Sequence, residues 1–210
     1  MEKNEIIETP EKIEDIPPPD AAAPLANFPN LNPEKKPINY KSYFNFIQGD
    51  VTTMKADVIV NSSTASMAPI TGVSKSIHKK CGPSLLIYLK QNYYGILPGS
   101  FVDSPGFNLS CKAILHVCGP DKNEEGILST IYDQCLNYCF NRNYHSIIFP
   151  CISTGGRKFN EEDACYTAIN TCRLWVEKYK DYWEGNITFC CFTNKSLEIY
   201  KKYFKEILNL

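Results

Sequence analysis

A short run of hydroxyl-bearing and glycine residues follows an apolar segment in the second half of the chain. Ser153, Thr154, Gly155 and Gly156 come directly after "HSIIFPCI", which has the β-branched and aromatic content of a buried strand. Hydroxyl groups donate hydrogen bonds, and glycines let backbone amides turn toward an anion. The run therefore predicts a phosphate-binding loop, although an ordinary tight turn has the same composition and stays open as an alternative.

A second candidate loop joins a strand to a helix. The segment "VNSSTASMAPITGVSKSIHKKCGP" starts as the end of a buried strand at Val60 and becomes amphipathic before it reaches Pro83. Its one glycine before the helix, Gly72, lies at the turn into that helix. Free backbone amides and a partial positive charge at a helix start favour a phosphate. The segment therefore predicts another position where an anion can be held.

The cysteines and histidines lack the spacing of a metal site. None of the ten cysteines forms a Cys-x-x-Cys pair, and the chain has only three histidines. Cys135 and Cys139 are one helical turn apart and Cys165 and Cys172 two turns apart, as expected of small apolar residues on the inner faces of helices. We expect no metal ion, no cofactor, and cysteines that act mainly as core residues.

Composition limits the partners of the chain. The formal net charge is −1 over 210 residues and the isoelectric point is about 6.3. This balance argues against general nucleic-acid binding, which depends on an excess of basic residues. The N-terminus lacks the apolar core of a secretory signal, and no apolar run approaches the roughly 20 residues that cross a bilayer. We expect a protein of the reducing cytoplasm or nucleus without membrane contact.

The chain divides into a tail and one domain. Residues 1–38 are acidic and proline-rich without a sustained apolar period, and we expect them to be disordered. Residues 39–210 alternate short β-branched runs with longer segments of helical period. Strands are expected at 43–48, 57–62, 100–105, 112–120, 145–152 and 186–192, and helices at 71–82, 83–94, 124–143, 160–179 and about 197–207.

The order of these elements predicts an α/β protein. Residues 114–118 and 147–149 are apolar without alternation, which indicates a sheet covered on both faces. We expect a three-layer α/β/α fold with a central mixed sheet. In such folds ligands lie beyond the carboxyl ends of the strands. The segments after "DVIV", "ILHV" and "IIFP" are therefore the expected places for a site.

Taken together, these segments resemble the macrodomain family, which binds ADP-ribose. "GDVT" is similar to the family's Gly-Asp-Ile-Thr, "VNSS" to its Val-Asn-Ala-Ala, and "FPCISTG" to its Phe-Pro-Ala-Ile-Ser-Thr-Gly. "GVSKSIHKKCGP" is similar to Gly-Val-Asp-Gly-Ala-Ile-His-Arg-Ala-Ala-Gly-Pro, and "AILHVCGP" to the strand that ends in His-x-x-Gly-Pro. The resemblance covers about residues 43 to 210 and implies a macrodomain fold over residues 39–210, with ADP-ribose or an ADP-ribosylated protein as partner.

The resemblance assigns roles to individual positions. Asp50 matches the acidic residue that accepts a hydrogen bond from the adenine amino group, with the amide of Val51 beside it; an aspartate that only makes a turn is the alternative. Gly72 and Val73 match the helix start that meets the diphosphate. Phe159 falls near the aromatic residue that lines the distal ribose. The remaining candidate ligand-binding residues are Asn61, Ser74, Ser153, Thr154, Gly155, Gly156 and Arg157.

Two positions depart from the hydrolytic members of the family. Thr64 replaces the second asparagine of Asn-Ala-Ala-Asn, which helps to position the distal ribose. Ser74 replaces an aspartate to which water activation or ribose orientation is attributed. A serine hydroxyl cannot act as a base near neutral pH without an activating partner. We expect simple hydrolysis of that type to be lost, and we assign no catalytic residue.

The first loop departs as well. Pro69, Ile70, Thr71 and Gly72 stand where the family has four glycines. Side chains at three of these positions restrict positive φ and keep a diphosphate away from the backbone. The altered glycine loop marks the chain as a divergent member, for which we expect weakened affinity.

Cations occupy positions that are usually neutral or aromatic in the family. Lys75 lies at the predicted helix start, and Arg157 and Lys158 follow the second phosphate loop. If they face the cleft, they favour a more highly charged ligand, such as a terminal phosphate or an ADP-ribosyl chain. Surface lysines usually point to solvent, so this alternative stays open.

One thiol and two histidines could suggest other chemistry. Cys151 follows a predicted strand and, with His116, offers a thiol nucleophile. Its position matches a small alanine of the family, which favours a buried structural residue. We expect His116 in the core and His78 in a structural role on the first helix.

Three functions follow from these observations. We favour binding of ADP-ribose or a related adenine nucleotide without turnover. Removal of mono-ADP-ribose from proteins by other residues is the first alternative. A degenerate domain that serves only as a protein-interaction scaffold is the second.

Overall fold

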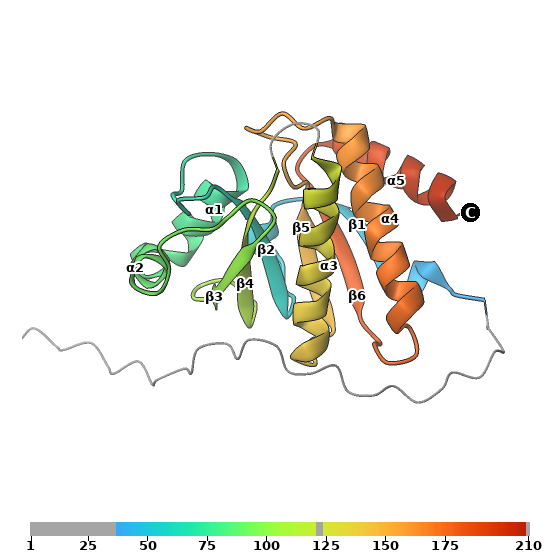
Figure 1. Ribbon diagram of the computed structural model, residues 1–210, viewed down its shortest axis with the longest axis horizontal. Helices are drawn as coiled ribbons and strands as arrows, with labels where there is room; N and C mark the ends of the chain where they lie inside the picture. The colour runs from blue at the N-terminus through green and yellow to red at the C-terminus, as the bar shows by residue number, and fades with distance from the viewer. Residues whose placement is uncertain (1–36, 121–123, 209–210) are drawn as a thin grey trace, which may run out of the picture. The chain divides into compact units, whose positions relative to one another are not determined.

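Six strands and five α-helices form the described part of the chain, residues 37–120 and 124–208 of a computed structural model (Figure 1). The strands are β1 (Phe44–Gln48), β2 (Val58–Ser63), β3 (Phe101–Pro105), β4 (Ala113–Cys118), β5 (Ser146–Pro150) and β6 (Asn186–Cys191). The helices are α1 (Gly72–Cys81), α2 (Pro83–Asn92), α3 (Glu125–Asn141), α4 (Glu161–Tyr179) and α5 (Asn194–Leu208). Every strand and helix expected from the sequence is confirmed.

Two short 3-10 helices were not predicted. They are η1 (Tyr40–Ser42) and η2 (Val51–Thr53), each three residues long and too short to show a helical period in the sequence. The tail expected at residues 1–38 lies outside the described residues except for its last two. Of these, Ile38 is partly buried against the larger core cluster.

The strands form one mixed sheet in the order β1-β6-β5-β2-β4-β3. Only β3 runs antiparallel to its neighbour, pairing with β4 from Phe101 opposite Val117 to Pro105 opposite Ala113. The other pairs are parallel. The carboxyl ends of five strands therefore meet at one edge, where the β2–α1 and β5–α4 loops gather at the top of Figure 1.

Helices cover both faces of the sheet, which confirms the three-layer α/β/α architecture. Val58 and Val60 of β2 belong to a core cluster shared with α3, α4 and α5. Ile59, between them, points to the opposite face and packs with Ile77 of α1 and Leu85 of α2. Since both faces are buried, the strands need apolar residues at successive positions, and this explains why their sequences do not alternate.

Local sequence signals fix the helix starts. The side chain of Asn160 accepts hydrogen bonds from the backbone amides of Glu162 and Asp163, so it caps α4 as expected. Pro83 occupies the first turn of α2, where its missing amide proton costs nothing. Gly72 begins α1 with φ of +58°, a left-handed conformation that strains other residues.

The cysteines behave mostly as the sequence predicts. All ten are free thiols, and Cys135, Cys139, Cys165 and Cys172 are buried in the larger core cluster. None of the helices in the described part of the chain combines the length and apolar character that crossing a bilayer requires.

Candidate functional site

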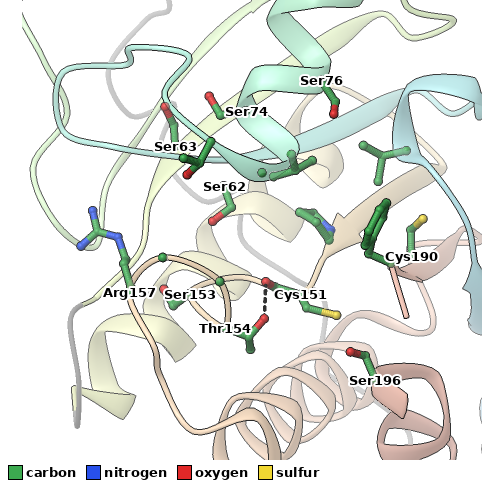
Figure 2. A pocket seen from close by; sticks show the side chains of 18 of the residues that line it. Ser62, Ser63, Ser74, Ser76, Cys151, Ser153, Thr154, Arg157, Cys190 and Ser196 are labelled. Carbon is green, nitrogen blue, oxygen red and sulfur yellow. Dashed lines mark hydrogen bonds between the residues drawn. The ribbon is translucent and has the colours of Figure 1, made fainter. Parts of the chain in front are cut away.

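A cavity of about 920 Å³ lies at the carboxyl edge of the sheet. Its walls come from the β2–α1 loop, the β5–α4 loop, the η2 region and the residues around the end of β6. Figure 2 shows side chains of the two loops on opposite sides of this space, with Arg157 toward one end and Cys190 and Ser196 toward the other. The volume lies within the range of small-molecule and cofactor sites.

The β2–α1 loop narrows the cavity less than its sequence suggests. Ile70 lines the cavity, yet 61% of its surface is exposed, so it stands on the wall and does not fill the space. The methyl group of an alanine at Gly72 would meet no atom within 4 Å. The amino end of α1 therefore opens toward the cavity although three family glycines are replaced.

The β5–α4 loop is held in a tight conformation. Ser153 has φ of +65°, which is uncommon for a residue with a side chain. The amide of Phe159 donates to the carbonyl of Ser153 at 3.1 Å, and that of Lys158 donates to Gly155 at 3.0 Å, closing the loop on itself. A methyl group at Gly119, after β4, would lie 2.1 Å from Ser153 Oγ, so the glycine makes room for this serine.

Two buried hydroxyl groups on the cavity wall have no hydrogen-bond partner within the described residues. Ser63 Oγ and Ser153 Oγ are both inaccessible and unpaired; Ser63 lines the cavity from the end of β2 and Ser153 from the β5–α4 loop. Buried polar groups are normally paired, since leaving one unpaired costs about 1–3 kcal/mol. Both hydroxyls are covered by protein atoms, and Ser153 Oγ lies against Gly119, so each would reach a ligand in the cavity only after rotation of its side chain.

Asp50 lies at the cavity wall just before η2. Its Oδ1 accepts a hydrogen bond from the backbone amide of Thr52 at 2.9 Å, so the residue caps the 3-10 helix. Asp50 therefore does make a turn, which was the alternative to a ligand-binding role, and it also lines the cavity. The side chain is exposed, and a carboxylate has lone pairs left after this one bond. One aspartate can therefore fix the turn and still accept a bond from a ligand.

A buried polar network stands behind the cavity wall. Asn61 Nδ2 donates to Nδ1 of His116 at 2.9 Å, which leaves the ring proton on Nε2, facing Ser104 Oγ at 2.9 Å. Asn61 Nδ2 is also 3.5 Å from Ser74 Oγ at the start of α1. Burial lowers the pKa of His116 from 6.5 to about 3, so its ring is neutral in ordinary buffers. His116 thus holds Asn61, and Asn61 holds Ser74.

The structure brings most of the predicted site residues together. All of them line the cavity except Asn61 and Phe159. Asn61 is fully buried and reaches the wall only through Ser74. Phe159 is 5% exposed and packs in the larger core cluster, so its ring does not line the cavity as the resemblance implied. The tight turn that begins at Ser153 directs the ring inward, which spacing alone does not reveal.

The three candidate cations lie in different environments. Arg157 lines the cavity, and its Nη2 approaches Cys118 Sγ at 3.2 Å. Lys75 and Lys158 are exposed and lie outside the cavity wall. Of these three candidate cations, only Arg157 therefore lies on the cavity wall.

The segment after β6 supplies residues that the sequence reasoning missed. Phe192, an aromatic residue that is 82% exposed, lines the cavity. Lys195 also lines it and pairs with Glu161 at 3.5 Å, while Ser196 Oγ donates to Glu161 Oε1. These residues follow the carboxyl end of a parallel strand, so the rule that located the other loops also applies to "NITFCCF".

Cys151 differs from its prediction. It packs against the larger core cluster but is not fully buried and also lines the cavity, whereas its position was interpreted as that of a small buried residue. His116 is not its partner, because both ring nitrogens of His116 contact Asn61 and Ser104. Within the described part of the chain, no three His, Cys, Asp or Glu side chains gather as ligands for a metal ion.

Comparisons with known proteins agree with this geometry. The profile of a family described as Macro domain matches residues 60–168. The chain is 33% identical over 164 residues to the O-acetyl-ADP-ribose deacetylase of Klebsiella pneumoniae, covering 74% of this chain and 93% of that protein. It is 32% identical over 169 residues to the human protein named ADP-ribose glycohydrolase MACROD2, covering 78% of this chain but only 39% of that protein.

A solved structure of another macrodomain has a similar fold. The Trypanosoma brucei macrodomain in complex with ADP-ribose superposes with a TM-score of 0.73 at 26% identity, covering 76% of this chain and 68% of that chain. The Macro domain profile includes both the β2–α1 and the β5–α4 loop that line the cavity.

Proposed function

The chain belongs to the Macro domain family, and we propose that its cavity binds ADP-ribose or a related adenine nucleotide, free or attached to a protein, without hydrolysing it. The observation that carries this proposal is the open cavity between the two strand-end loops, with Asp50 and Arg157 among its wall residues. The names of the relatives, which refer to ADP-ribose and O-acetyl-ADP-ribose, support the same ligand class.

The η2 region and the segment after β6 are suited to an adenine. Asp50 offers a carboxylate oxygen that accepts a bond from an exocyclic amino group. Phe192 offers an exposed aromatic face on the same cavity. Stacking of a base on an aromatic side chain contributes about 1–3 kcal/mol. We therefore place the adenine between these two side chains.

The space between the two loops is suited to a diphosphate. The amino end of α1 at Gly72 supplies backbone amides and the positive end of a helix dipole. Ser63 and Ser153 line the cavity, and rotation of either side chain would present its unpaired hydroxyl to phosphate or ribose oxygens. Arg157 adds a positive charge at the opposite end from Cys190 and Ser196 in Figure 2.

The absence of turnover is proposed from the charges on the cavity wall. Among the described residues that line it, only Asp50 and Glu161 carry carboxylates. Asp50 caps η2, and Glu161 is held by Lys195 and Ser196. Ser74 Oγ has no basic partner, since Asn61 Nδ2 is a donor. None of these groups is placed to activate a water molecule in the way that general base catalysis requires.

Hydrolysis is the second candidate, because the relatives carry the names deacetylase and glycohydrolase. Two measurements on the full chain separate the candidates. Calorimetric titration with ADP-ribose is expected to give saturable heat, and incubation with a mono-ADP-ribosylated protein is expected to release no ADP-ribose above the rate without protein. Saturable heat with rapid release would replace the binding function by hydrolysis. No heat and no release would leave only the scaffold function.

A further inference from the structure

Three thiols gather where β5 and β6 end beside the cavity. Cys190 and Cys191 close β6, and Cys151 follows directly after β5. Cys151 and Cys190 line the cavity, whereas Cys191 is completely buried in the larger core cluster. Figure 2 shows Cys151 and Cys190 on the cavity wall near Ser196. The site therefore contains thiol chemistry that the proposed binding function does not use.

The strand register sets Cys151 beside Cys191. Pro150 pairs with Cys190 in the parallel β5–β6 ladder, so the next residue on each strand is Cys151 and Cys191. Cys151 continues the chain just past this last pair, and both thiols contact the larger core cluster, which lies on one face of the sheet. Neighbouring strands lie about 4.8 Å apart, which is within the Cα separation of about 4.4–6.8 Å that a disulfide spans.

The two thiols have opposite acidities. The neighbouring Cys191 thiol is the main cause that lowers the pKa of Cys151 below 9.0, whereas burial and the carboxylate of Glu161 oppose this shift. The Cys151 thiol, together with burial, raises the pKa of Cys191. Cys151 is thus the better nucleophile and Cys191 the protonated neighbour.

Cys190 is a natural comparison for Cys151. It lines the same cavity, but burial raises its pKa to about 11. Its Sγ points to the carbonyl of Gly49 at 3.4 Å, on the other face of the sheet from Cys191. Cys190 therefore has access to the cavity without the neighbour or the acidity that makes a thiol reactive.

We propose that Cys151 is a reactive thiol site that takes hydroperoxides entering the cavity, and that Cys191 is the thiol that resolves the oxidised product. A partly buried thiol that lines a cavity, beside a second, fully buried thiol, is the arrangement expected of a reversible oxidation site. The inference does not depend on ADP-ribose, because the thiols and the cavity are present whatever ligand the cavity accepts.

The hydroperoxide is the two-electron oxidant in this reaction. The Cys151 thiolate attacks the terminal peroxide oxygen, so a sulfur–oxygen bond forms, the oxygen–oxygen bond breaks, and the alkoxide leaves and takes a proton from solvent. Cys191 sulfur then attacks the sulfenic acid; the sulfur–sulfur bond forms and the hydroxyl leaves as water with the Cys191 proton. Two thiols lose two electrons, and the peroxide gains them.

The first test measures reactivity on the folded chain without added ligand. Iodoacetamide near neutral pH is expected to alkylate Cys151 at least about ten-fold faster than Cys190, with site-resolved rates from mass spectrometry. Equal rates at the two cavity thiols, or faster reaction of another cysteine, would overturn the proposal.

The second test uses hydrogen peroxide and a matched pair of variants. Wild type and Cys190→Ser are expected to form a Cys151–Cys191 disulfide that dithiothreitol reverses. Cys191→Ser is expected to form no disulfide and to accumulate a sulfenic acid at Cys151 that dimedone captures. A disulfide through Cys190, or peroxide modification elsewhere with Cys151 intact, would contradict the inference. If Cys191→Ser does not fold, the alkylation ranking and the Cys190→Ser result still decide it.

Discussion

The hydroxyl oxygen of Ser74 lies 3.5 Å from the side-chain nitrogen of Asn61, beneath the first turn of α1. At this position the family resemblance implies an aspartate in hydrolytic members. The hydrogen bond to His116 fixes the side-chain amide of Asn61. A side chain at position 74 therefore meets the Asn61 Nδ2 donor in a fixed orientation. The Asn61–His116 pair therefore has the geometry to orient a carboxylate at position 74, where this chain has a serine.

Restoring that carboxylate should restore turnover. Ser74→Asp places an acceptor opposite Asn61 Nδ2 at a helix start, where negative charge is favoured. We expect release of ADP-ribose from a mono-ADP-ribosylated protein to rise by about ten-fold to a hundred-fold, the lower part of what a positioned base contributes. The matched control is Ser76→Asp, since Ser76 also lines the cavity from α1. Wild type that already hydrolyses as fast as Ser74→Asp would contradict the account.

The adenine preference should depend on Asp50. A carboxylate only accepts hydrogen bonds, so it favours the adenine amino group over the carbonyl of hypoxanthine. Wild type is expected to bind ADP-ribose about ten-fold tighter than its inosine analogue, the lower end for a bond to a charged group. Asp50→Asn keeps an acceptor for Thr52 and adds a donor, so this ratio should fall to about one or invert.

Calorimetric titrations of both nucleotides into each variant measure the ratio. Asp181→Asn on the exposed surface is the control for loss of one charge and should leave the ratio unchanged. An Asp50→Asn protein with the wild-type ratio would show that the carboxylate does not contact the base.

Alanine substitutions at two glycines of the site should distinguish an effect on stability from an effect on ligand binding. Gly72→Ala introduces no clash but must keep φ of +58°, so we expect a loss of about 1 kcal/mol in the free energy of unfolding. Gly155→Ala has open space and no positive φ, so unfolding should change by less than about 0.5 kcal/mol. Its methyl group nevertheless enters the loop that lines the cavity, and affinity for ADP-ribose should fall.

Denaturant unfolding and calorimetry on the same samples test this pair. An unchanged affinity in Gly155→Ala would mean that the ligand does not approach the β5–α4 loop. A Gly72→Ala protein as stable as wild type would mean that the α1 start adapts without strain.

Acid should destabilise the protein through His116. Its pKa is about 3 in the folded chain, against 6.5 for an unperturbed histidine. The unfolded chain therefore binds the proton first, so the stabilisation is complete above pH 6.5 and is lost as pH falls toward 3. We expect a loss of about 1.4 kcal/mol per pH unit from this group between about pH 6 and 4. Burial also lowers the pKa of His78, which acts in the same direction.

Unfolding measured across this range in His116→Gln should show a slope shallower by about one proton. Equal slopes in wild type and His116→Gln would show that the buried ring is protonated in the folded chain.

The fold was predictable because its signals are local. Short β-branched runs and helical periods located every strand and helix, and Asn160 and Pro83 marked two helix starts that the structure confirms. The 3-10 helices escaped because three residues carry no period.

The positions of the motif-bearing loops were predictable from the sequence, whereas the orientations of individual side chains were not. Both predicted loops, at Gly72 and Ser153, line the cavity. Phe159, which the resemblance set near a ribose, is buried in the larger core cluster, and residue spacing does not encode that orientation. Phe192 and Lys195 follow the last strand in a segment without glycines or a phosphate-loop motif, so no local signal marks them as cavity residues.

A crystal structure of the protein soaked with ADP-ribose tests the central claim most directly. We expect the adenine between Asp50 and Phe192, the diphosphate between the α1 start and the β5–α4 loop, and the distal ribose toward Arg157. Density for the nucleotide outside this cavity, or a cavity that excludes it at saturating concentration with Ile70 folded into the space, would contradict the account.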